Sequence, residues 1–246
     1  MSRISDLKVK IFADGADYDG IVKMSRNPVI KGFTTNPTLM RKAGVSDYEA
    51  FARKVLTTIT DRPVSFEVFA DDFPSMAEQA RAIATWGPNV NVKIPVTNTK
   101  GQPSTELLHT LSSEGIVLNV TAIFSLDQVR AIAEALDPKT PAIVSVFAGR
   151  IADTGVDPIP HMRACKKLLA SRPKAELLWA STREFLNIFH AEECGTDIIT
   201  VPNEFLGKLD LVGKDFDEYS RETVQMFYRD ATASAFEIKP KRVAAE

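Results

Sequence analysis

The sequence is poor in cysteine, has no long apolar run and carries no excess of either charge. Its two cysteines, Cys165 and Cys194, are too few for a disulfide scaffold, and a reducing cytoplasm is the simplest location. No apolar run approaches the roughly 20 residues that cross a bilayer, and the opening "MSRISDLKVKIFADG" lacks the apolar core of a signal peptide. The 30 basic and 32 acidic residues leave a net charge of -2, which predicts neither nucleic-acid nor membrane partners.

Histidine is equally scarce, and the few histidines show no metal-binding pattern. His190 and Cys194 are four residues apart on an expected helix, but no second pair of ligands accompanies them. His109 and His161 also fall in expected helices and show no catalytic-triad spacing. We therefore expect no metal site.

Short apolar runs recur along the whole chain, each followed by a helix-like stretch, and this rhythm predicts parallel βα units. We expect strands over 8–14, 32–36, 64–68, 89–95, 117–123, 142–149, 176–181 and 197–202. The clearest helical patterns cover 48–60, 74–86, the stretch after Ser125, 157–171, 183–193 and 215–232.

Eight such units in about 250 residues match the size of a (β/α)8 barrel, so the predicted fold is a single α/β TIM barrel with an extra C-terminal helix. We expect the barrel and this helix to fill residues 1–236 and a flexible tail to fill 237–246. A doubly wound open sheet is the main competitor, but its central strands are apolar on both faces. Here several strands alternate polar and apolar residues toward their C-terminal ends.

The polar residues of these strands share one face and one end of the predicted barrel. They are Asp14, Thr34, Asn36, Ser65, Glu67, Lys93, Asn119, Thr121, Ser145, Ser181 and, just beyond its strand, Arg183. Any one of them is most simply a solvated side chain or a partner of the backbone. Because barrel enzymes keep their active sites at the C-terminal ends of the strands, their agreement predicts a chemical site there.

Lys93 stands out because it interrupts the apolar strand "NVNVKIPVT". Burial disfavours the charged form of an amine, and a neutral amine can attack a carbonyl to form a Schiff base, which is an electron sink for cleavage of a C–C bond. The alternative is structural: a Lys93–Glu67 ion pair that only fills the barrel.

Seven blocks of the chain also resemble, in order, those of the transaldolase family, which includes the fructose-6-phosphate aldolases. The blocks are "ADGADYDGI", "KGFTTNPTLM", "VSFEVFA", "VNVKIPVT", "LNVTAIFSLDQ", "VFAGRIAD" and "WASTRE". The resemblance runs from about residue 8 to 205. It implies a (β/α)8 barrel, a Schiff-base lysine at Lys93, and no metal or organic cofactor.

The resemblance also implies roles for single residues. Asp14 would be the general acid/base during C–C cleavage, and Glu67 and Thr121 would move protons through a shared water. The bound three-carbon dihydroxyacetone unit would be held by Asn36, Asn119 and Ser145, and walled off from water by Phe147. The sugar phosphate would bind to Arg150, Ser181 and Arg183, since guanidinium groups are suited to phosphate.

Two positions favour the transaldolase branch. The resembling aldolases carry glutamine and tyrosine where this chain has Glu67 and Phe147. A tyrosine hydroxyl could protonate the carbanion and release free dihydroxyacetone, whereas phenylalanine leaves the intermediate to an acceptor aldehyde. Thr182 departs from the aromatic residue often found between the serine and the arginine of the phosphate block, which leaves the donor and the acceptor open.

We therefore expect a transaldolase that uses sedoheptulose 7-phosphate or fructose 6-phosphate as donor, and that works as a homo-oligomer, as the family suggests. The alternatives are a fructose-6-phosphate-type aldolase and a transaldolase for a modified ketose such as a sulfosugar. A catalytically inactive sugar-phosphate-binding protein is the non-enzyme alternative, although such a protein would usually have lost Lys93 or an acid/base residue.

Overall fold

A computed structural model of the protein describes residues 4–235 and 237–238. The described residues up to Leu209 form one compact unit, and those from Asp210 onward form a second. Apart from residues 237 and 238, the expected tail over 237–246 lies outside the described residues. The expected domain boundaries stay predictions.

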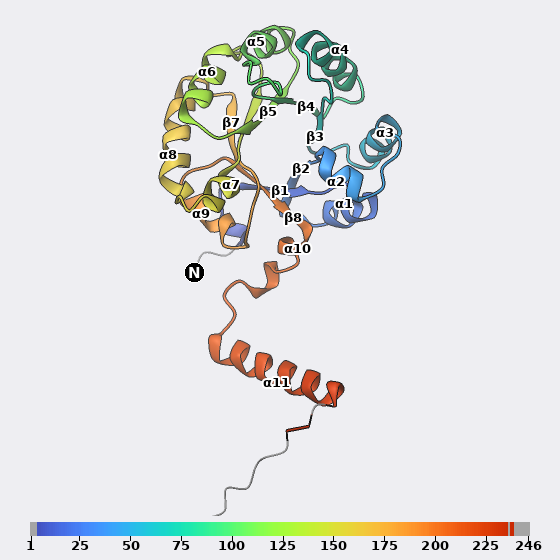
Figure 1. Ribbon diagram of the computed structural model, residues 1–246, viewed down its shortest axis with the longest axis vertical. Coiled ribbons are helices and arrows are strands. Elements are labelled where there is room, and N and C mark those ends of the chain that lie inside the picture. The colour runs from blue at the N-terminus through green and yellow to red at the C-terminus, as the bar shows by residue number, and fades with distance from the viewer. Residues whose placement is uncertain (1–3, 236, 239–246) are drawn as a thin grey trace, which may run out of the picture. The chain divides into compact units, whose positions relative to one another are not determined.

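Eight parallel strands close into a barrel in chain order, so that β1 pairs with both β2 and β8 (Figure 1). The strands are β1 (Lys10–Asp14), β2 (Ile30–Thr34), β3 (Val64–Glu67), β4 (Val90–Pro95), β5 (Leu118–Ile123), β6 (Ala142–Val146), β7 (Ala175–Trp179) and β8 (Ile198–Pro202). The predicted (β/α)8 barrel is confirmed, and with it the additional C-terminal helix α11 (Phe216–Ser234).

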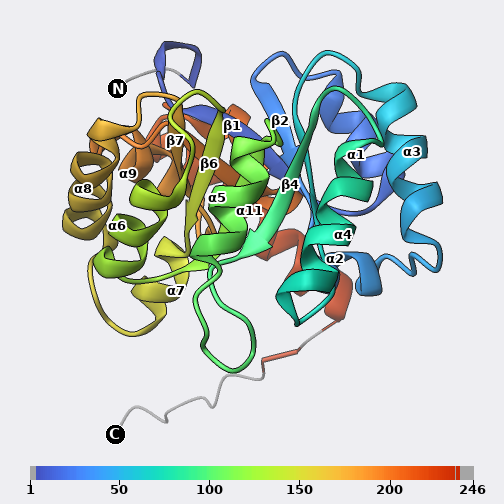
Figure 2. The ribbon, with the colours of Figure 1, turned by 90° about the horizontal axis from the view of Figure 1, so that it is seen from above.

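Helices surround the strands, as Figure 2 shows for the side that carries α4 to α8. The helices of the barrel unit are α1 (Tyr18–Ser25), α2 (Pro37–Lys42), α3 (Tyr48–Thr58), α4 (Phe73–Ala84), α5 (Thr105–Ser113), α6 (Leu126–Ala135), α7 (Ala148–Asp153), α8 (Pro158–Leu168), α9 (Asn187–Glu193) and α10 (Asn203–Leu206). Short 3-10 turns occur at Ile4–Asp6, Leu169–Ser171 and Leu209–Leu211.

Most helix starts follow from a polar residue that caps the free backbone N–H groups of the first turn. Asp47 accepts a hydrogen bond from the backbone N of Ala50, and Asp72 accepts one from that of Ser75. Ser125 and Gln128 form a reciprocal capping box at the start of α6. These caps fix the point at which each chain segment turns from a strand end into its helix.

An apolar cluster fills the inside of the barrel below its C-terminal end. It consists of Phe12, Ile143, Leu178, Ala180 and Ile198, with Phe147 packed against it. Phe12 fits because its neighbour across the β1–β2 pair is Gly32, where an added Cβ would lie 2.6 Å from the Phe12 ring. The cluster closes the barrel from below, so any inner polar residue nearer the C-terminal end sits on an apolar floor.

The structure corrects several predicted boundaries. The strand predicted over 32–36 runs from Ile30 to Thr34, because Asn36 caps α2 instead. The strand predicted over 142–149 ends at Val146; Phe147 is the N-cap of α7, and Ala148 and Gly149 are the first residues of that helix. Helix α9 begins at Asn187 rather than at 183, because the Asn187 side chain accepts hydrogen bonds from the backbone of the turn before it.

The second unit consists mainly of α11. Asp215 caps this helix by accepting hydrogen bonds from the backbone N–H groups of Asp217 and Glu218. The spacing of Phe216, Tyr219 and Phe227 places these three rings along one face of the helix. No helix among the described residues combines the length and the apolar character needed to cross a membrane.

Candidate active site

Lys93 projects into the C-terminal end of the barrel, where it is 7% exposed. Its Nζ lies 3.0 Å from Oε2 of Glu67 and donates a hydrogen bond of 2.8 Å to the backbone carbonyl of Thr35. Glu67 and Lys93 are register partners on the neighbouring strands β3 and β4. The amine is thus buried, paired with a carboxylate and held in one direction.

Asp14, the last residue of β1, is half-buried at the same end of the barrel. Its Oδ1 accepts a hydrogen bond of 2.7 Å from the Thr34 hydroxyl, which also contacts the hydroxyl of Thr200 on β8. Burial of the carboxyl raises the pKa of Asp14, whereas the Thr34 hydrogen bond and the Lys93 charge lower it and the Glu67 charge raises it. The charges of Lys93 and Glu67 therefore both act on the Asp14 carboxyl.

A chain of buried polar side chains lies beside the amine on β3, β5 and β6. Asn119, the register partner of Lys93, donates a hydrogen bond of 3.0 Å to the Ser65 hydroxyl and accepts one of 2.6 Å from the Ser145 hydroxyl. All three side chains are buried. Because every polar atom in this chain is oriented by another, the Asn119 amide is held rigidly next to Lys93.

Thr121 is buried two residues farther along β5, next to an irregularity in that strand. The register of the β5–β6 pair shifts between Val120 and Ile123, and Ala122 has a φ of 60°, a left-handed conformation that costs energy for a residue with a Cβ. Such bulges redirect side chains near active sites. The regular alternation predicted for this strand therefore ends at Thr121.

The residues predicted to bind phosphate gather at the turns after β6 and β7. Arg150 on α7 is exposed, and its guanidinium lies 5.5 Å from the centre of the Phe147 ring. Ser181 is half-buried with a φ of 64°. Arg183 makes a two-pronged ion pair with Asp153, which raises the pKa of Arg183 and lowers that of Asp153. One of the two predicted guanidinium groups thus already holds a carboxylate.

The structure brings the predicted residues together unequally. Direct contacts or register pairing join Lys93 to Glu67 and Asn119, and Asn119 to Ser145. Asn36 lies at the same strand ends, but its Oδ1 accepts a hydrogen bond from the backbone N of Leu39, so this oxygen serves as a helix cap.

Sequence reasoning missed three residues around this site. Thr200 had a signal, because it is the polar inner residue of β8 in an otherwise apolar strand. Asp153 had no such signal, because a carboxylate at the end of a short helix does not reveal that it pairs with Arg183. Tyr48 also had none, because its place as the first residue of α3 says nothing about its hydroxyl, which contacts the backbone of Glu67.

Gly149 is a position where the close approach of the turns after β6 and β7 demands glycine. A Cβ there would lie 1.6 Å from the backbone carbonyl oxygen of Ser181, which cannot move aside like a flexible side chain. We expect Gly149→Ala to lower the free energy of unfolding by about 3 kcal/mol, as other overpacked substitutions do, and to weaken phosphate binding. Urea unfolding measures the first effect. Gly207→Ala is the control, because its nearest contact of 3.6 Å is ordinary. Equal stability of the two variants would contradict this account of the turns.

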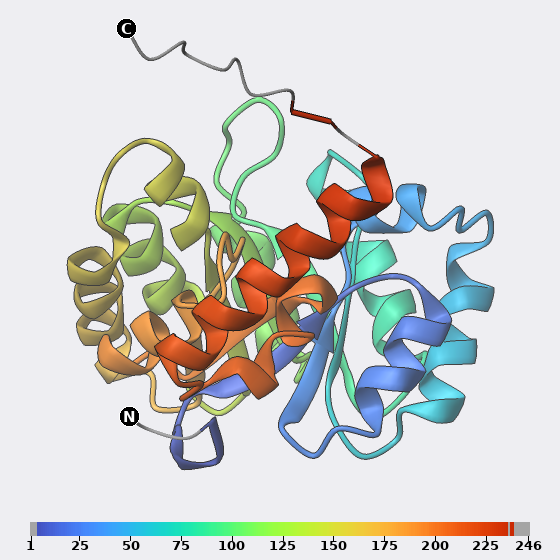
Figure 3. The ribbon, with the colours of Figure 1, turned by 90° about the horizontal axis from the view of Figure 1, so that it is seen from below.

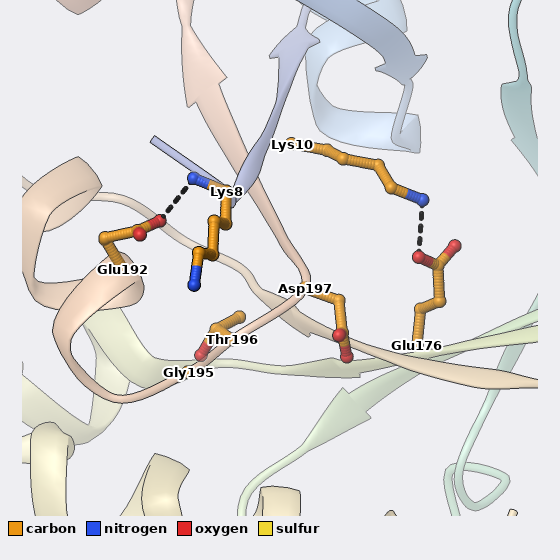
Figure 4. Close-up of a pocket in the computed structure, with 7 residues that line it drawn as sticks. All are labelled: Lys8, Lys10, Glu176, Glu192, Gly195, Thr196 and Asp197. Carbon is orange, nitrogen blue, oxygen red and sulfur yellow. Dashed lines mark hydrogen bonds and ion pairs between the residues drawn. The ribbon is translucent and has the colours of Figure 1, made fainter. Parts of the chain in front are cut away.

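A pocket lies at the opposite end of the barrel from Lys93, beside the first residue of β1, and Figure 4 shows its charged lining. Lys10 pairs with Glu176, and Glu192 accepts hydrogen bonds from the backbone N–H groups of Lys8 and Val9. Asp197 pairs with a lysine of α8. Its carboxylates are therefore engaged in holding β1, β7 and β8 together. Residues at the N-terminal end of a barrel typically serve the stability of the fold in this way.

The loop after β4 projects beyond the strand ends, where Figure 3 shows it in green. Thr97 and Pro103 pair across the loop, and Thr99 donates two hydrogen bonds of 2.7 Å to the carboxylate of Asp71.

Among the residues that the structure describes, no group of three or more His, Cys, Asp or Glu side chains could hold a metal ion.

Comparison with known proteins gives one consistent family. Residues 11–245 match the family described as Transaldolase/Fructose-6-phosphate aldolase. A "Probable transaldolase 2" of Listeria monocytogenes is 37% identical over 82% of this chain and 88% of its own length. A "Probable transaldolase" of Dehalococcoides mccartyi is 36% identical over 80% of this chain and 88% of its own length.

Solved structures share the fold at low identity. The structure of KGPDC from Streptococcus mutans superposes with a TM-score of 0.56, covers 83% of this chain and 99% of its own, and is 8% identical in sequence. At this identity the likeness concerns the barrel alone.

Proposed function

The chain belongs to the transaldolase/fructose-6-phosphate aldolase family, and we propose that it acts there as a transaldolase with a Schiff base on Lys93. The observation that carries this proposal is the environment of the Lys93 amine. It is buried, 3.0 Å from Glu67, and next to the oriented amide of Asn119. An ion pair that only filled the barrel would explain the first two features, but not the ordered polar chain beside them.

The proposed reaction begins when the Lys93 amine attacks the ketone of a ketose phosphate and water leaves, with Glu67 and Thr121 moving the protons. Asp14 then takes the proton of the C4 hydroxyl, the C3–C4 bond breaks, and its electron pair passes to the imine to give an enamine. The aldose phosphate leaves. Burial raises the pKa of Asp14, which makes its carboxyl a better proton acceptor than an exposed aspartate, so that it can accept and return a proton.

The second half of the reaction reverses these steps with a different aldehyde. The enamine attacks the carbonyl of the acceptor, Asp14 returns its proton to the new hydroxyl, and water releases the product from Lys93. Asn119 and Ser145, with Asn36, would hold the hydroxyl groups of the three-carbon unit. The Asn119 amide and the Ser145 hydroxyl already orient each other at 2.6 Å, which supports such a role.

Arg150, Ser181 and Arg183 would bind the phosphate of donor and acceptor. The Arg183 guanidinium would then either bind the phosphate together with the Asp153 carboxylate or release Asp153, because the carboxylate and the phosphate present oxygens to the same donors. We propose sedoheptulose 7-phosphate or fructose 6-phosphate as donor, with a homo-oligomer in the cytoplasm as the working form. A panel of ketose phosphates, assayed with and without acceptor aldehydes, identifies the substrates.

Phe147 provides the test that separates transfer from simple cleavage. Its ring packs on the apolar floor of the barrel and offers no proton to the enamine. We expect Phe147→Tyr to raise the ratio of released dihydroxyacetone to transferred dihydroxyacetone at least about tenfold, because a positioned acid typically contributes this much or more.

The control for this ratio is Phe124→Tyr, which adds a hydroxyl to the neighbouring ring, 5.8 Å from Phe147 between centres and 40% exposed. This variant should keep the wild-type ratio. Release of free dihydroxyacetone by the wild-type protein at full rate without an acceptor would instead make the protein an aldolase.

A further inference from the structure

The backbone of Glu67 is held by a side chain from one of the helices that surround the strands. The hydroxyl of Tyr48 accepts a hydrogen bond of 2.7 Å from the backbone N of Glu67 and lies 3.0 Å from its carbonyl oxygen, to which it donates. One hydroxyl can do both, because it has one hydrogen to donate and free lone pairs to accept. A single atom therefore satisfies both backbone groups of the residue whose carboxylate pairs with Lys93.

The reason for this arrangement lies in where β2 stops. Pairing between β2 and β3 ends with a hydrogen bond from the backbone N of Thr35 to the carbonyl of Ser65. In a parallel ladder the next bond would run from the backbone N of Glu67 to the carbonyl of Thr35. That carbonyl instead accepts a hydrogen bond of 2.8 Å from Nζ of Lys93. The Tyr48 hydroxyl thus accepts the hydrogen bond of the Glu67 backbone N in place of the Thr35 carbonyl, which is bonded to Lys93.

The position of the hydroxyl is itself fixed. The cap at Asp47 sets the start of α3, of which Tyr48 is the first residue. The Tyr48 ring packs edge-on against Trp86 with 5.3 Å between ring centres, and lies 4.5 Å from the ring of Phe69. Burial raises the pKa of Tyr48 above its ordinary range, so the hydroxyl keeps its proton at any working pH.

The three residues that follow Glu67 are held as well. The backbone N of Val68 donates to the carbonyl of Lys93, and those of Phe69 and Ala70 donate to the side-chain oxygen of Gln79. Each backbone N–H from Glu67 to Ala70 therefore has a partner, and the Tyr48 hydroxyl supplies the one closest to the amine.

We propose that Tyr48 is a positioning residue, which clamps the backbone of Glu67 and so sets both partners of the Lys93 amine. This inference rests on the proposed function of Glu67 and Lys93, and adds to it a residue on the surrounding helix α3. Without the hydroxyl, the backbone N of Glu67 has no partner except the Thr35 carbonyl, and it would compete with Lys93 for that oxygen.

Tyr48→Phe removes one atom and keeps the ring. We expect kcat for transfer to fall about tenfold, because displacing a reacting group by a fraction of an ångström is costly, while KM for the donor changes less than twofold. Borohydride trapping at Lys93 should slow to the same extent. Tyr18→Phe is the matched control, because the Tyr18 hydroxyl contacts only Thr58 among the hydrogen bonds described, at 2.9 Å. This variant should match wild type.

A double-mutant cycle shows whether Tyr48 acts through Glu67. In a Glu67→Gln background, Tyr48→Phe should lower kcat clearly less than in wild type, because the part of the loss that acts through the Glu67 carboxylate is already present there. Incorporating 4-aminophenylalanine at position 48, whose amine can donate to the Glu67 carbonyl and, more weakly than a hydroxyl, accept from the Glu67 backbone N, should restore part of kcat and also serves if Tyr48→Phe is unstable.

Three results would overturn the proposal: a Tyr48→Phe protein that turns over like Tyr18→Phe, an equal loss in both Glu67 backgrounds, or no rescue by 4-aminophenylalanine. A wild-type protein that forms no trapped adduct would refute the proposed function itself, and so is distinguishable from these outcomes.

Discussion

Lys93→Ala should reduce transfer between a ketose phosphate and an acceptor aldehyde by at least roughly 10⁴-fold, the scale of losing a covalent nucleophile. The amine is the only group in the account that forms a bond to the substrate, and alanine offers no replacement. Since the proposed phosphate site at Arg150 and Arg183 is left intact, binding of the donor should survive. Stopped turnover with retained binding, measured by a coupled assay and by calorimetry, is the expected pattern.

Lys10→Ala is the control for this loss. Lys10 also sits on a barrel strand and pairs with a glutamate, Glu176, but at the opposite end of the barrel. This variant should retain wild-type turnover. If Lys93→Ala kept more than about a hundredth of the activity, the amine would not be the nucleophile, and the Lys93–Glu67 pair would be structural.

Asp14→Asn should be the next most damaging change, with transfer reduced roughly 10³-fold because no other acid/base is assigned to C–C cleavage. Asparagine has nearly the shape of aspartate, and its Oδ1 can still accept the hydrogen bond from Thr34. The same variant should be more stable than wild type at neutral pH. Burial makes ionisation of Asp14 unfavourable in the folded protein, and asparagine removes that cost.

The pH dependence of this stability difference has a definite sign. Below the ordinary aspartate pKa of 3.8, Asp14 is protonated in both the folded and the unfolded chain, so it costs nothing. As the pH rises from 3.8 toward the raised folded-state pKa, the unfolded chain loses its proton first, and wild type loses stability relative to Asp14→Asn. Thermal melting as a function of pH should therefore show an advantage for the variant that grows as the pH rises from 3.8 to the folded-state pKa and stays constant above it.

Asp61→Asn is the matched control, because the hydrogen bond with the Arg62 guanidinium lowers the pKa of Asp61. Its stability difference should have the opposite sign and be small, since Asp61 is exposed, and its activity should be unchanged. An Asp14→Asn protein that still transfers the three-carbon unit would remove Asp14 from the proposed mechanism.

The alternation of polar and apolar residues was enough to predict the centre of this site. A period of two puts Glu67 on the inner face of β3, Lys93 on that of β4 and Asn119 on that of β5, and closure of the barrel brings them into register. The pairing of Glu67 with Lys93 at 3.0 Å follows from this geometry.

The rest depended on tertiary contacts that no local pattern encodes. Asn36 is an exception: the sequence predicts it at the end of a strand, although Pro37, which suits the first turn of a helix, favours the helix cap that Asn36 forms. The close approach of Gly149 to the Ser181 carbonyl joins two segments that are far apart in the sequence, so no local pattern predicts it. Tyr48 matters because β2 stops short, which becomes visible only once β2 and β3 are paired.

Borohydride reduction of the wild-type protein during turnover of a ketose phosphate tests the central claim most directly. The account predicts that peptide mass spectrometry finds one stable three-carbon adduct, on the peptide that contains Lys93, and none when the donor is omitted. An adduct confined to a different lysine, or no adduct under conditions of full turnover, would contradict it.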